Sequence, residues 1–330
     1  MKKFYELTYQ GRVRRLRKLA IEALKDYDLE VVSLRLLTNE FNGIFRVDTV
    51  SGGRYILRIS RPNEHELNEI LSEMMWLAAL GRDTDLMVPE PLETSKGELV
   101  TTIEVPGVPE PRHCVIFGWV AGRDLSEQLI PQNLHKAGAF TALLHEHGEN
   151  FQPSEEFSIN RYNSVFPFGD PVVVFDEEIG DVISDDQRAL FTRGVEIVQR
   201  VIDELHAGDQ NPGVIHADLH QWNLRIFRGR MGAIDFEDLM WGYPLQDIAI
   251  TFYYLQGRED YTNLHEAYML GYQTRRDWPE QYPGQMDVMI AGRGLDLLNY
   301  VLQDKDPEWR EQAPAFIARN EKRLLDLGIT

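Results

Sequence analysis

The hydrophobic pattern in the first part of the chain changes period several times. Residues 8–27 carry apolar side chains at helical spacing with Arg and Lys between them, which predicts one amphipathic helix. Three short segments with period-two alternation follow, separated by the turn sequences Asn42-Gly43 and Ser51-Gly52-Gly53. These patterns predict three consecutive antiparallel strands over 31–37, 43–50 and 54–59.

Helical spacing returns over residues 63–80, and Gly81 is expected to end this helix. Strand-like segments then recur at 99–105 and 113–120. Strands, a helix and further strands in this order indicate a small α+β domain with an antiparallel sheet, and they argue against alternating βαβ units.

Beyond Gly122 the apolar spacing is mainly helical. Five segments predict helices, over 132–147, 187–206, 245–255, 260–273 and 286–302. Short strand-like segments lie between them, at 214–216, 224–227 and 231–236. The sequence therefore predicts a sheet-rich N-terminal lobe over 1–117, a hinge at 118–122 and a larger helical lobe over 123–330.

The net charge of the chain limits which classes of partner it can bind. The 330 residues include 34 Lys and Arg against 53 Asp and Glu, which gives a net charge of −19. A nucleic-acid or anionic-membrane binder needs a basic face, so the composition argues against both. The single Cys114 excludes an internal disulfide, and neither a secretory signal nor a run of about 18 apolar residues is seen. We therefore expect a cytoplasmic protein with a small-molecule partner, most easily a cationic one.

Two neighbouring stretches, 214–224 and 232–238, contain a cluster of polar residues. Short apolar segments flank these polar residues. Asp218 and Asn223 are five residues apart, and Asp235 follows twelve residues after Asn223. These side chains supply one candidate base and two oxygen ligands of the kind that Mg²⁺ prefers. Phosphoryl transfer requires a positioned hydroxyl, a metal ion and charge stabilisation, with little covalent chemistry from the protein.

The motif His216-x-Asp218-x-x-x-x-Asn223, followed by Ile234-Asp235-Phe236, resembles the catalytic and metal-binding loops of the aminoglycoside phosphotransferase family. The segment Leu245-Gln246-Asp247-Ile248-Ala249 resembles the start of that family's downstream helix. The family also contains choline, homoserine and stress-response kinases. The resemblance implies an α+β, two-lobed, protein-kinase-like fold with a small antiparallel-sheet N-terminal lobe.

The resemblance also implies roles for the residues of these loops. Asp218 would accept or orient the proton of the acceptor hydroxyl, and His216 would support the loop. Asn223 and Asp235 would hold Mg²⁺. By itself Asp218 is equally explained by a turn or a helix cap, but its spacing from the two oxygen ligands favours the catalytic interpretation.

In the N-terminal lobe the resemblance places Asn42 and Gly43 over the nucleotide phosphates, although an ordinary hairpin turn explains the same residues. Arg58 stands on the third strand, where the family carries a Lys that pairs with phosphates. Arg keeps the charge but is not interchangeable with Lys. Its ion-pair partner is expected to be Glu73, with Glu69 one turn earlier as the alternative.

Residues 115–122 resemble the family's connector between the lobes. On this alignment the Gly118 carbonyl and the Val120 amide would hydrogen-bond the purine, and Phe117 would line the back of the pocket. A plain buried strand is the alternative explanation of this apolar run.

Acceptor contacts are expected from polar and aromatic side chains near the catalytic loops. Acids and aromatics suit an amino sugar or polyamine through charge pairing and cation–π contact. The candidates are His220, Glu237, Asp238, Trp241 and Tyr243, and Asp277 and Asp296 lie on later helical segments. His145 is expected to be a structural histidine.

The favoured function is an ATP- and Mg²⁺-dependent kinase, with GTP as the alternative donor. It transfers the γ-phosphoryl group to an alcohol group of a small, cationic acceptor, such as an aminoglycoside-like compound or an amino-alcohol or sugar metabolite. Three alternatives stay open. They are a Ser/Thr protein kinase of the stress-response type, a metal-dependent hydrolase using His216, Asp218 and His220, and a catalytically silent nucleotide-binding module suggested by Arg58.

Overall fold

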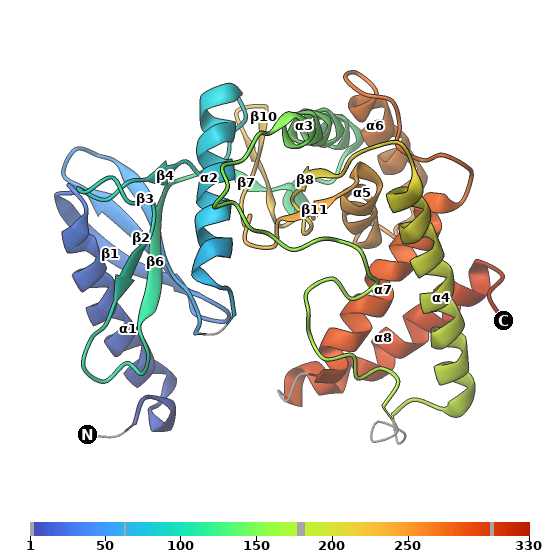
Figure 1. The fold of residues 1–330 in the computed structure, drawn as a ribbon, viewed down its shortest axis with the longest axis horizontal. Coiled ribbons are helices and arrows are strands. Elements are labelled where there is room, and N and C mark those ends of the chain that lie inside the picture. The colour runs from blue at the N-terminus through green and yellow to red at the C-terminus, as the bar shows by residue number, and fades with distance from the viewer. Residues whose placement is uncertain (1–2, 63, 177–181, 304–306) are drawn as a thin grey trace. The chain divides into compact units, whose positions relative to one another are not determined.

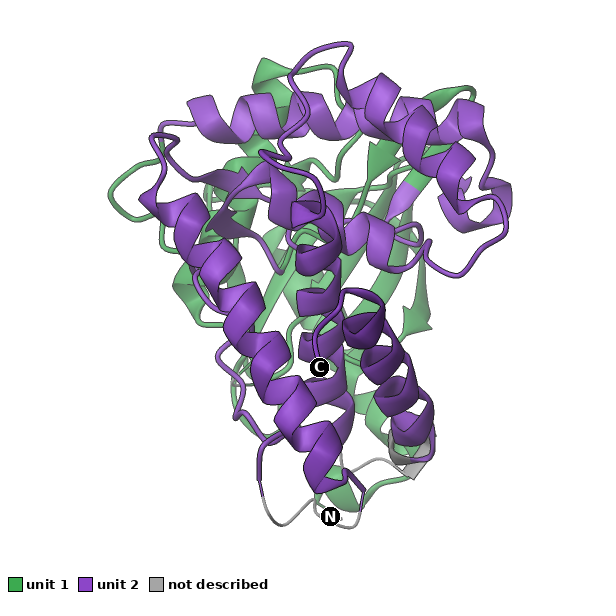
Figure 2. Cartoon of the chain, turned by 90° about the vertical axis from the view of Figure 1, so that its right-hand side faces the viewer, with its two compact units in different colours: residues 1–122, 153–159, 225–237 green, residues 123–152, 160–224, 238–330 purple. Residues whose placement is uncertain are grey.

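The computed structural model describes residues 3–62, 64–176, 182–303 and 307–330 (Figure 1). The chain folds into two compact units (Figure 2). The first comprises residues 1–122, 153–159 and 225–237, and the second comprises 123–152, 160–224 and 238–330. The first unit therefore includes Asp235, although it lies far along the chain from the N-terminal sheet. The lobe and hinge boundaries expected from the sequence stay predictions.

The first unit is built on an antiparallel sheet. Its strands run in the order β1-β2-β3-β6-β4, and β5 also pairs with β6. The bounds are β1 (Val31–Thr38), β2 (Gly43–Thr49), β3 (Arg54–Ile59), β4 (Pro91–Leu92), β5 (Thr101–Ile103) and β6 (Arg112–Gly118). The three consecutive strands predicted from the period-two pattern are confirmed. The two-residue β4 was missed, because it is too short to show a period.

Helix α1 (Tyr9–Ala23) packs on this sheet, with the short 3-10 helices η1 (Phe4–Glu6) and η2 (Leu24–Asp26) at its ends. Leu19 and Ala20 of α1 are fully buried in one apolar core with Phe45 and Leu57 of the sheet. The predicted amphipathic helix is confirmed, and its apolar stripe is what covers the sheet.

Helix α2 (Leu67–Asp83) runs further than the sequence indicated. It passes through Gly81 and ends at Asp83. The next residue, Thr84, caps the helix: its backbone N–H donates to the Leu80 carbonyl at 3.1 Å, and its hydroxyl donates to the same oxygen at 2.6 Å. Because Thr84 satisfies that carbonyl, the helix does not need a glycine terminator. The expected helix start, residue 63, lies outside the described residues.

The first unit also contains most of the hairpin formed by β9 (Leu224–Phe227) and β10 (Arg230–Ala233). The Ala233 backbone N–H donates to the Met87 carbonyl at 3.1 Å, and an added Cβ at Gly232 would lie 2.5 Å from that oxygen. Phe236, just after the hairpin, packs edge-on against Trp76 of α2 with ring centroids 5.7 Å apart. These contacts place Asp235 between two anchored neighbours.

The second unit is mainly helical. Its helices are η3 (Leu125–Gln128), α3 (Pro131–Asn150), α4 (Asp185–Ala207), α5 (Pro244–Tyr253), α6 (Tyr261–Tyr272), α7 (Gln285–Gln303) and α8 (Pro307–Asp326). The short strands are β7 (Arg123–Asp124), β8 (Gly213–Ile215) and β11 (Met240–Gly242), of which β8 and β11 pair antiparallel. The five predicted helices are confirmed; α8 and β11 were not predicted.

Glycines let several elements of this unit approach closely. An added Cβ at Gly138 of α3 would lie 2.0 Å from the Tyr268 carbonyl of α6, and one at Gly148 would lie 2.0 Å from the Val214 carbonyl of β8. Helix α3 therefore touches both α6 and β8 backbone to backbone, and β8 leads directly into the polar cluster. The α+β fold is confirmed. No helix in the described part of the chain combines the length and the apolar character needed to cross a membrane.

Candidate active site

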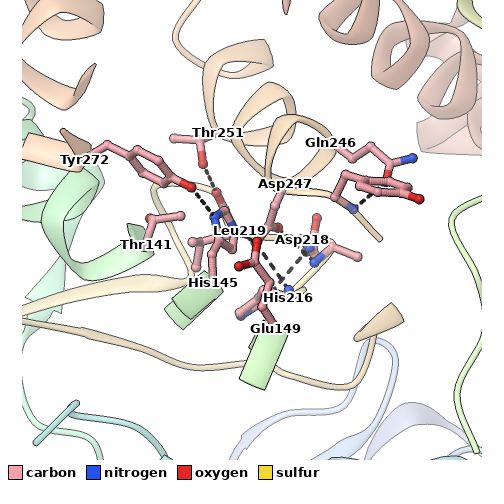
Figure 3. Close-up of polar contacts among 12 residues, drawn as sticks. Thr141, His145, Glu149, His216, Asp218, Leu219, Gln246, Asp247, Thr251 and Tyr272 are labelled. Atoms are coloured by element: carbon pink, nitrogen blue, oxygen red, sulfur yellow. Dashed lines mark hydrogen bonds and ion pairs between the residues drawn. The ribbon is translucent and has the colours of Figure 1, made fainter. Parts of the chain in front are cut away.

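Residues 216–223 of the polar cluster form a loop that follows β8 in the second unit (Figure 3). Asp247, in the first turn of α5, holds the backbone of this loop. Its Oδ1 accepts a hydrogen bond of 2.9 Å from the Ala217 N–H, and its Oδ2 accepts one of 3.3 Å from the His216 N–H. Ala217 has φ of 61°, in the left-handed region that non-glycine residues rarely adopt. A buried carboxylate therefore stabilises a strained backbone directly before Asp218.

Asp247 is itself oriented by His145 of α3. The Nε2 atom of His145 lies 2.9 Å from Asp247 Oδ2, and its Nδ1 lies 3.0 Å from the Tyr272 hydroxyl. His145 and Asp247 are buried. His145 is thus a structural histidine, as expected. The sequence resemblance included Asp247 but assigned it no role, because its partners come from elements far away in the chain.

The Asp218 carboxylate has three side-chain partners in the second unit. Oδ1 accepts a hydrogen bond of 2.7 Å from Nη2 of Arg293. Oδ2 accepts one of 3.1 Å from Nδ2 of Asn223 and lies 3.3 Å from Nε2 of His220. The Asp218 backbone N–H donates to Nδ1 of His216 at 3.3 Å. The loop therefore brings together His216, Asp218, His220 and Asn223; their catalytic, metal-binding and acceptor roles stay predictions.

The environment keeps Asp218 ionised. Burial alone would raise the pKa of Asp218, but the hydrogen bond from His220 and the charge of Arg293 hold the pKa below its ordinary value. An ionised carboxylate can accept a hydrogen bond from a hydroxyl and orient it. Sequence reasoning missed Arg293, whose only signal is a charged residue inside the apolar run 288–295.

Asn223 fits a hard metal ion. Both of its side-chain hydrogen bonds use Nδ2 as donor, to the Asp218 carboxylate and to the Asp218 backbone carbonyl at 3.0 Å. This leaves its amide oxygen, a ligand type that Mg²⁺ accepts, facing away from Asp218. Among the described residues no group of three or more His, Cys, Asp and Glu could hold a metal ion. A cation here would therefore need the amide oxygen, phosphate oxygens or water to complete its ligands.

Asp235, the second predicted metal ligand, belongs to the first unit, where it has φ of 67°. A left-handed aspartate held between a hairpin and a buried aromatic is a costly conformation that the fold maintains. That Asp235 and Asn223 bind one ion stays a prediction.

A second polar cluster lies within the first unit, around Arg58. Nη1 of Arg58 donates to Oε1 of Glu73 at 2.9 Å, and Nη2 contacts Oε2 of the same residue. Glu237 approaches Nη1 to 3.5 Å. Glu73 is thus the ion-pair partner of Arg58, as expected, whereas Glu69 accepts a hydrogen bond from the Glu66 N–H at 2.9 Å.

Burial and the neighbouring charges shift the pKa values of Arg58 and Glu73 in opposite directions. Burial raises the pKa of Glu73 above its ordinary value although Arg58 opposes it. Burial would lower the pKa of Arg58, but Glu73 and Glu237 raise it, so the guanidinium stays charged. The guanidinium also lies over the Phe117 ring, 5.2 Å from its centroid. The predicted phosphate-binding cation and pocket-lining aromatic are therefore neighbours.

Two other predicted residues occupy unexpected surroundings in the first unit. Nδ2 of Asn42 donates to Glu237 at 2.6 Å, and its Oδ1 accepts the Arg61 N–H at 3.0 Å. Glu237, expected at the acceptor, therefore belongs to the Arg58 cluster, and both ends of the Asn42 amide have protein partners. At Gly43 φ is not positive and an added Cβ would make only ordinary contacts. The phosphate contacts of Asn42 and Gly43 stay predictions.

At the end of β6 the backbone is partly paired. The Gly118 N–H donates to the Glu90 carbonyl at 2.8 Å, and the Trp119 N–H donates to the Arg54 carbonyl at 3.1 Å. Neither bond uses the Gly118 carbonyl or the Val120 amide, the groups predicted to bind the purine. Those two contacts stay predictions.

The remaining acceptor candidates differ in position. Trp241 of β11 pairs with Val214 of β8, so its backbone belongs to the small sheet. Tyr243 is 3% exposed, caps α5 and packs edge-on against His206 at 5.1 Å. Asp238 begins the second unit's last segment. Their acceptor roles stay predictions. Two residues that were not predicted, Trp222 and Tyr254, pack edge-on against His220 at 5.3 and 4.9 Å.

Comparison with solved structures shows the fold. The microcompartment-associated aminopropanol kinase has a TM-score of 0.80 and 28% sequence identity, covering 95% of this chain and 99% of that one. The amicoumacin kinase hAmiN, in complex with AMP-PNP, Ca²⁺ and Ami, has a TM-score of 0.77 and 18% identity, covering 96% of each chain. A thermostable mutant of an aminoglycoside phosphotransferase has a TM-score of 0.63 and 18% identity, covering 95% and 99%. The protein-kinase-like α+β fold is confirmed.

Sequence comparison agrees with the fold. An amicoumacin kinase of Bacillus subtilis (strain 168) is 23% identical over 241 residues, and the match spans 70% of this chain and 66% of the relative. The family described as the phosphotransferase enzyme family matches residues 35–283, a range that includes Arg58, Asp218 and Asp247. On this evidence the chain belongs to the phosphotransferase enzyme family.

Proposed function

We propose that this protein is a kinase that transfers the γ-phosphoryl group of ATP, with Mg²⁺, to a hydroxyl of a small amine-bearing acceptor. The observation that carries the proposal is the environment of Asp218. Its carboxylate is held ionised by His220 and Arg293 on a loop stabilised by Asp247. An anchored, charged carboxylate of this kind suits the task of orienting an acceptor hydroxyl for in-line attack.

Residues of this chain are available for proton acceptance, metal binding and phosphate binding in this reaction. Asp218 accepts the hydrogen bond of the acceptor hydroxyl and takes its proton as the new P–O bond forms, while the bond between the γ-phosphorus and the β,γ-bridging oxygen breaks and ADP leaves. Asn223 and Asp235 would hold Mg²⁺, which would neutralise charge on the phosphate oxygens. Arg58, oriented by Glu73, binds phosphate oxygens of the nucleotide.

An amino alcohol is the acceptor class that the site supports best. The aromatic rings of His220, Trp222 and Tyr254 are mutually edge-on beside Asp218, and such rings favour a nearby ammonium group. The relatives named above are kinases of aminopropanol and amicoumacin, and hAmiN was solved with AMP-PNP and a divalent ion. Both lines of support favour a small, cationic hydroxyl compound.

The test is a nucleotide-consumption screen with Mg²⁺ and a panel of amino alcohols, amino sugars and hydroxylated metabolites. The Asp218→Asn protein serves as the blank, and Asp260→Asn, which changes an exposed aspartate, serves as the matched control. Acceptor-dependent consumption by the wild type and the control, but not by the blank, supports the proposal. Equal consumption by all three proteins contradicts it.

The same assays separate the alternatives. Thermal stabilisation by Zn²⁺ alone would favour the hydrolase, and nucleotide binding without any turnover would favour the silent module. Phosphate transfer to protein serines but to no small acceptor would favour the protein kinase. The cytoplasmic location and the absence of nucleic-acid or membrane partners stay predictions that follow from composition.

A further inference from the structure

Arg293 of α7 joins two buried carboxylates of the second unit. Its Nη2 donates to Asp218 Oδ1 at 2.7 Å, and its Nη1 donates to Asp296 Oδ2 at 2.8 Å. The Arg293 side chain is 7% exposed. It lies over the Phe168 ring, 5.9 Å from the centroid. A buried cation in this position needs a carboxylate partner, because an unpaired buried charge is strongly destabilising.

The two ion pairs differ in kind. Asp296 lies three residues after Arg293 on the same helix. Their ion pair therefore holds the guanidinium against α7 independently of the Asp218 side chain. A guanidinium is planar and presents its N–H groups in a rigid fork. Once Asp296 holds one nitrogen, the direction of the other nitrogen toward Asp218 is determined.

This direction matters for the plane of the Asp218 carboxylate. Asn223 and His220 both contact Oδ2, at 3.1 and 3.3 Å, and the shorter contact of 2.7 Å at Oδ1 comes from Arg293. Contacts at one oxygen leave rotation of the carboxylate about its Cβ–Cγ bond open. A charged donor at the other oxygen restricts that rotation.

Resting on the proposed function, we infer that Arg293, anchored by Asp296, is a positioning residue that holds the Asp218 carboxylate in the orientation needed to receive the acceptor hydroxyl. Its effect should fall on the chemical step. Misorientation of a reacting group by about 1 Å can cost about 10²-fold in rate. The acceptor KM should change much less, because Arg293 acts through Asp218.

The test measures kcat and KM of two variants that keep the buried charge balanced. Arg293→Lys retains the positive charge but cannot present a planar fork to both carboxylates. The double variant Arg293→Met/Asp296→Asn removes one positive and one negative charge together. We expect both to lower kcat by roughly 10-fold to 10²-fold with little change in acceptor KM. Arg275→Met, which removes an exposed ion pair with Glu146, is the control and should match the wild type.

A mutant cycle then shows whether Arg293 acts through Asp218. In the Asp218→Asn background, Arg293→Lys should change the residual turnover little, because the group it positions is gone. Full additivity of the two losses, or wild-type kcat in Arg293→Lys or in the double variant, would overturn the inference while leaving the proposed function intact.

A wild type without acceptor-dependent turnover would instead overturn the proposed function. The contact itself is still tested in that case by urea unfolding of Asp218→Asn, Arg293→Lys and their combination. Strong non-additivity of the unfolding free energies is expected for a direct ion pair, and additivity would contradict it.

Discussion

The Asp247 carboxylate accepts a 2.9 Å hydrogen bond from the backbone N–H of Ala217, the left-handed residue immediately before Asp218. Asp247 is buried and comes from α5, thirty residues later in the chain. The pair links the start of a helix to the backbone conformation of the candidate catalytic loop. A change at Asp247 should therefore affect both stability and turnover.

Asp247→Ala should leave two backbone N–H groups and His145 without their acceptor. Each unsatisfied buried group costs about 1–3 kcal/mol, so we expect a loss of several kcal/mol in unfolding free energy and strongly reduced turnover. Urea unfolding followed by circular dichroism measures the first effect. The exposed Asp260→Asn is the control, and a variant as stable as wild type would contradict the structural role of Asp247.

Arg58→Met should destabilise the first unit, because it leaves Glu73 and Glu237 close together without a cation. Breaking a buried pair costs about 3–5 kcal/mol, whereas Arg82→Met, which removes an exposed pair with Asp83, should cost less than about 1 kcal/mol. Adding Glu73→Gln to Arg58→Met should recover part of the loss. Unfolding midpoints of the four proteins provide the measurement, and equal effects of the two Met substitutions would argue against the buried cluster.

Asp296 introduces a dependence of stability on pH. Burial raises its pKa from 3.8 to about 6, despite the opposing effect of Arg293. Between these values the folded state binds more protons than the unfolded state, so this contribution is fully present below pH 3.8 and is lost as pH rises through about 6. The unfolding free energy of wild type minus that of Asp296→Asn should therefore fall by on the order of 3 kcal/mol over this range. A difference that is flat or rises with pH would refute the shift.

Gly148→Ala should push α3 away from β8, since the new Cβ would lie 2.0 Å from the Val214 carbonyl. Forcing extra atoms into a packed interior costs about 1–3 kcal/mol, and the displaced β8 should also lower turnover. Gly208→Ala is the matched control, because an added Cβ there would lie 3.5 Å from its nearest neighbour, the Leu205 carbonyl. Similar melting temperatures for the two variants would contradict the close approach.

Removal of the proposed metal ligands should suppress catalysis without unfolding the protein. Asn223→Ala and Asp235→Ala are each expected to lower turnover strongly, and EDTA should abolish the thermal stabilisation of the wild type by ATP and Mg²⁺. The exposed Asn150→Ala is the control for the amide substitution. Near wild-type kinetics of Asp235→Ala would remove this residue from the metal site.

The sequence predicted the elements of both units well where the period was long enough to be seen. The strands 31–37, 43–50 and 54–59 and the five helices of the second unit all correspond to observed elements. It failed at short or locally capped features, such as β4, β11 and the end of α2 before Thr84, and it also missed the 20-residue α8. The short features depend on strand pairing or on local hydrogen bonds, which leave no periodic trace.

The candidate catalytic motif was also recognisable, because Asp218 and Asn223 lie on one loop and a five-residue spacing already places them together. The contacts of Arg293 and Asp247 with this loop could not be predicted in the same way, because these residues lie far from the loop in the chain. Arg293 reaches Asp218 across 75 residues, and Glu237 joins Asn42 across 195 residues. Nothing in the local pattern of any of these segments indicates its partner.

Local patterns thus sufficed for the secondary structure, the antiparallel sheet and the position of the candidate base, because backbone geometry and side-chain period act over a few residues. The packing of the helices and strands decided which charges surround that base, which glutamate joins Arg58 and what stabilises the strained Ala217. Those contacts join residues that are distant in the chain, and only burial in a common interior brings them within hydrogen-bonding distance.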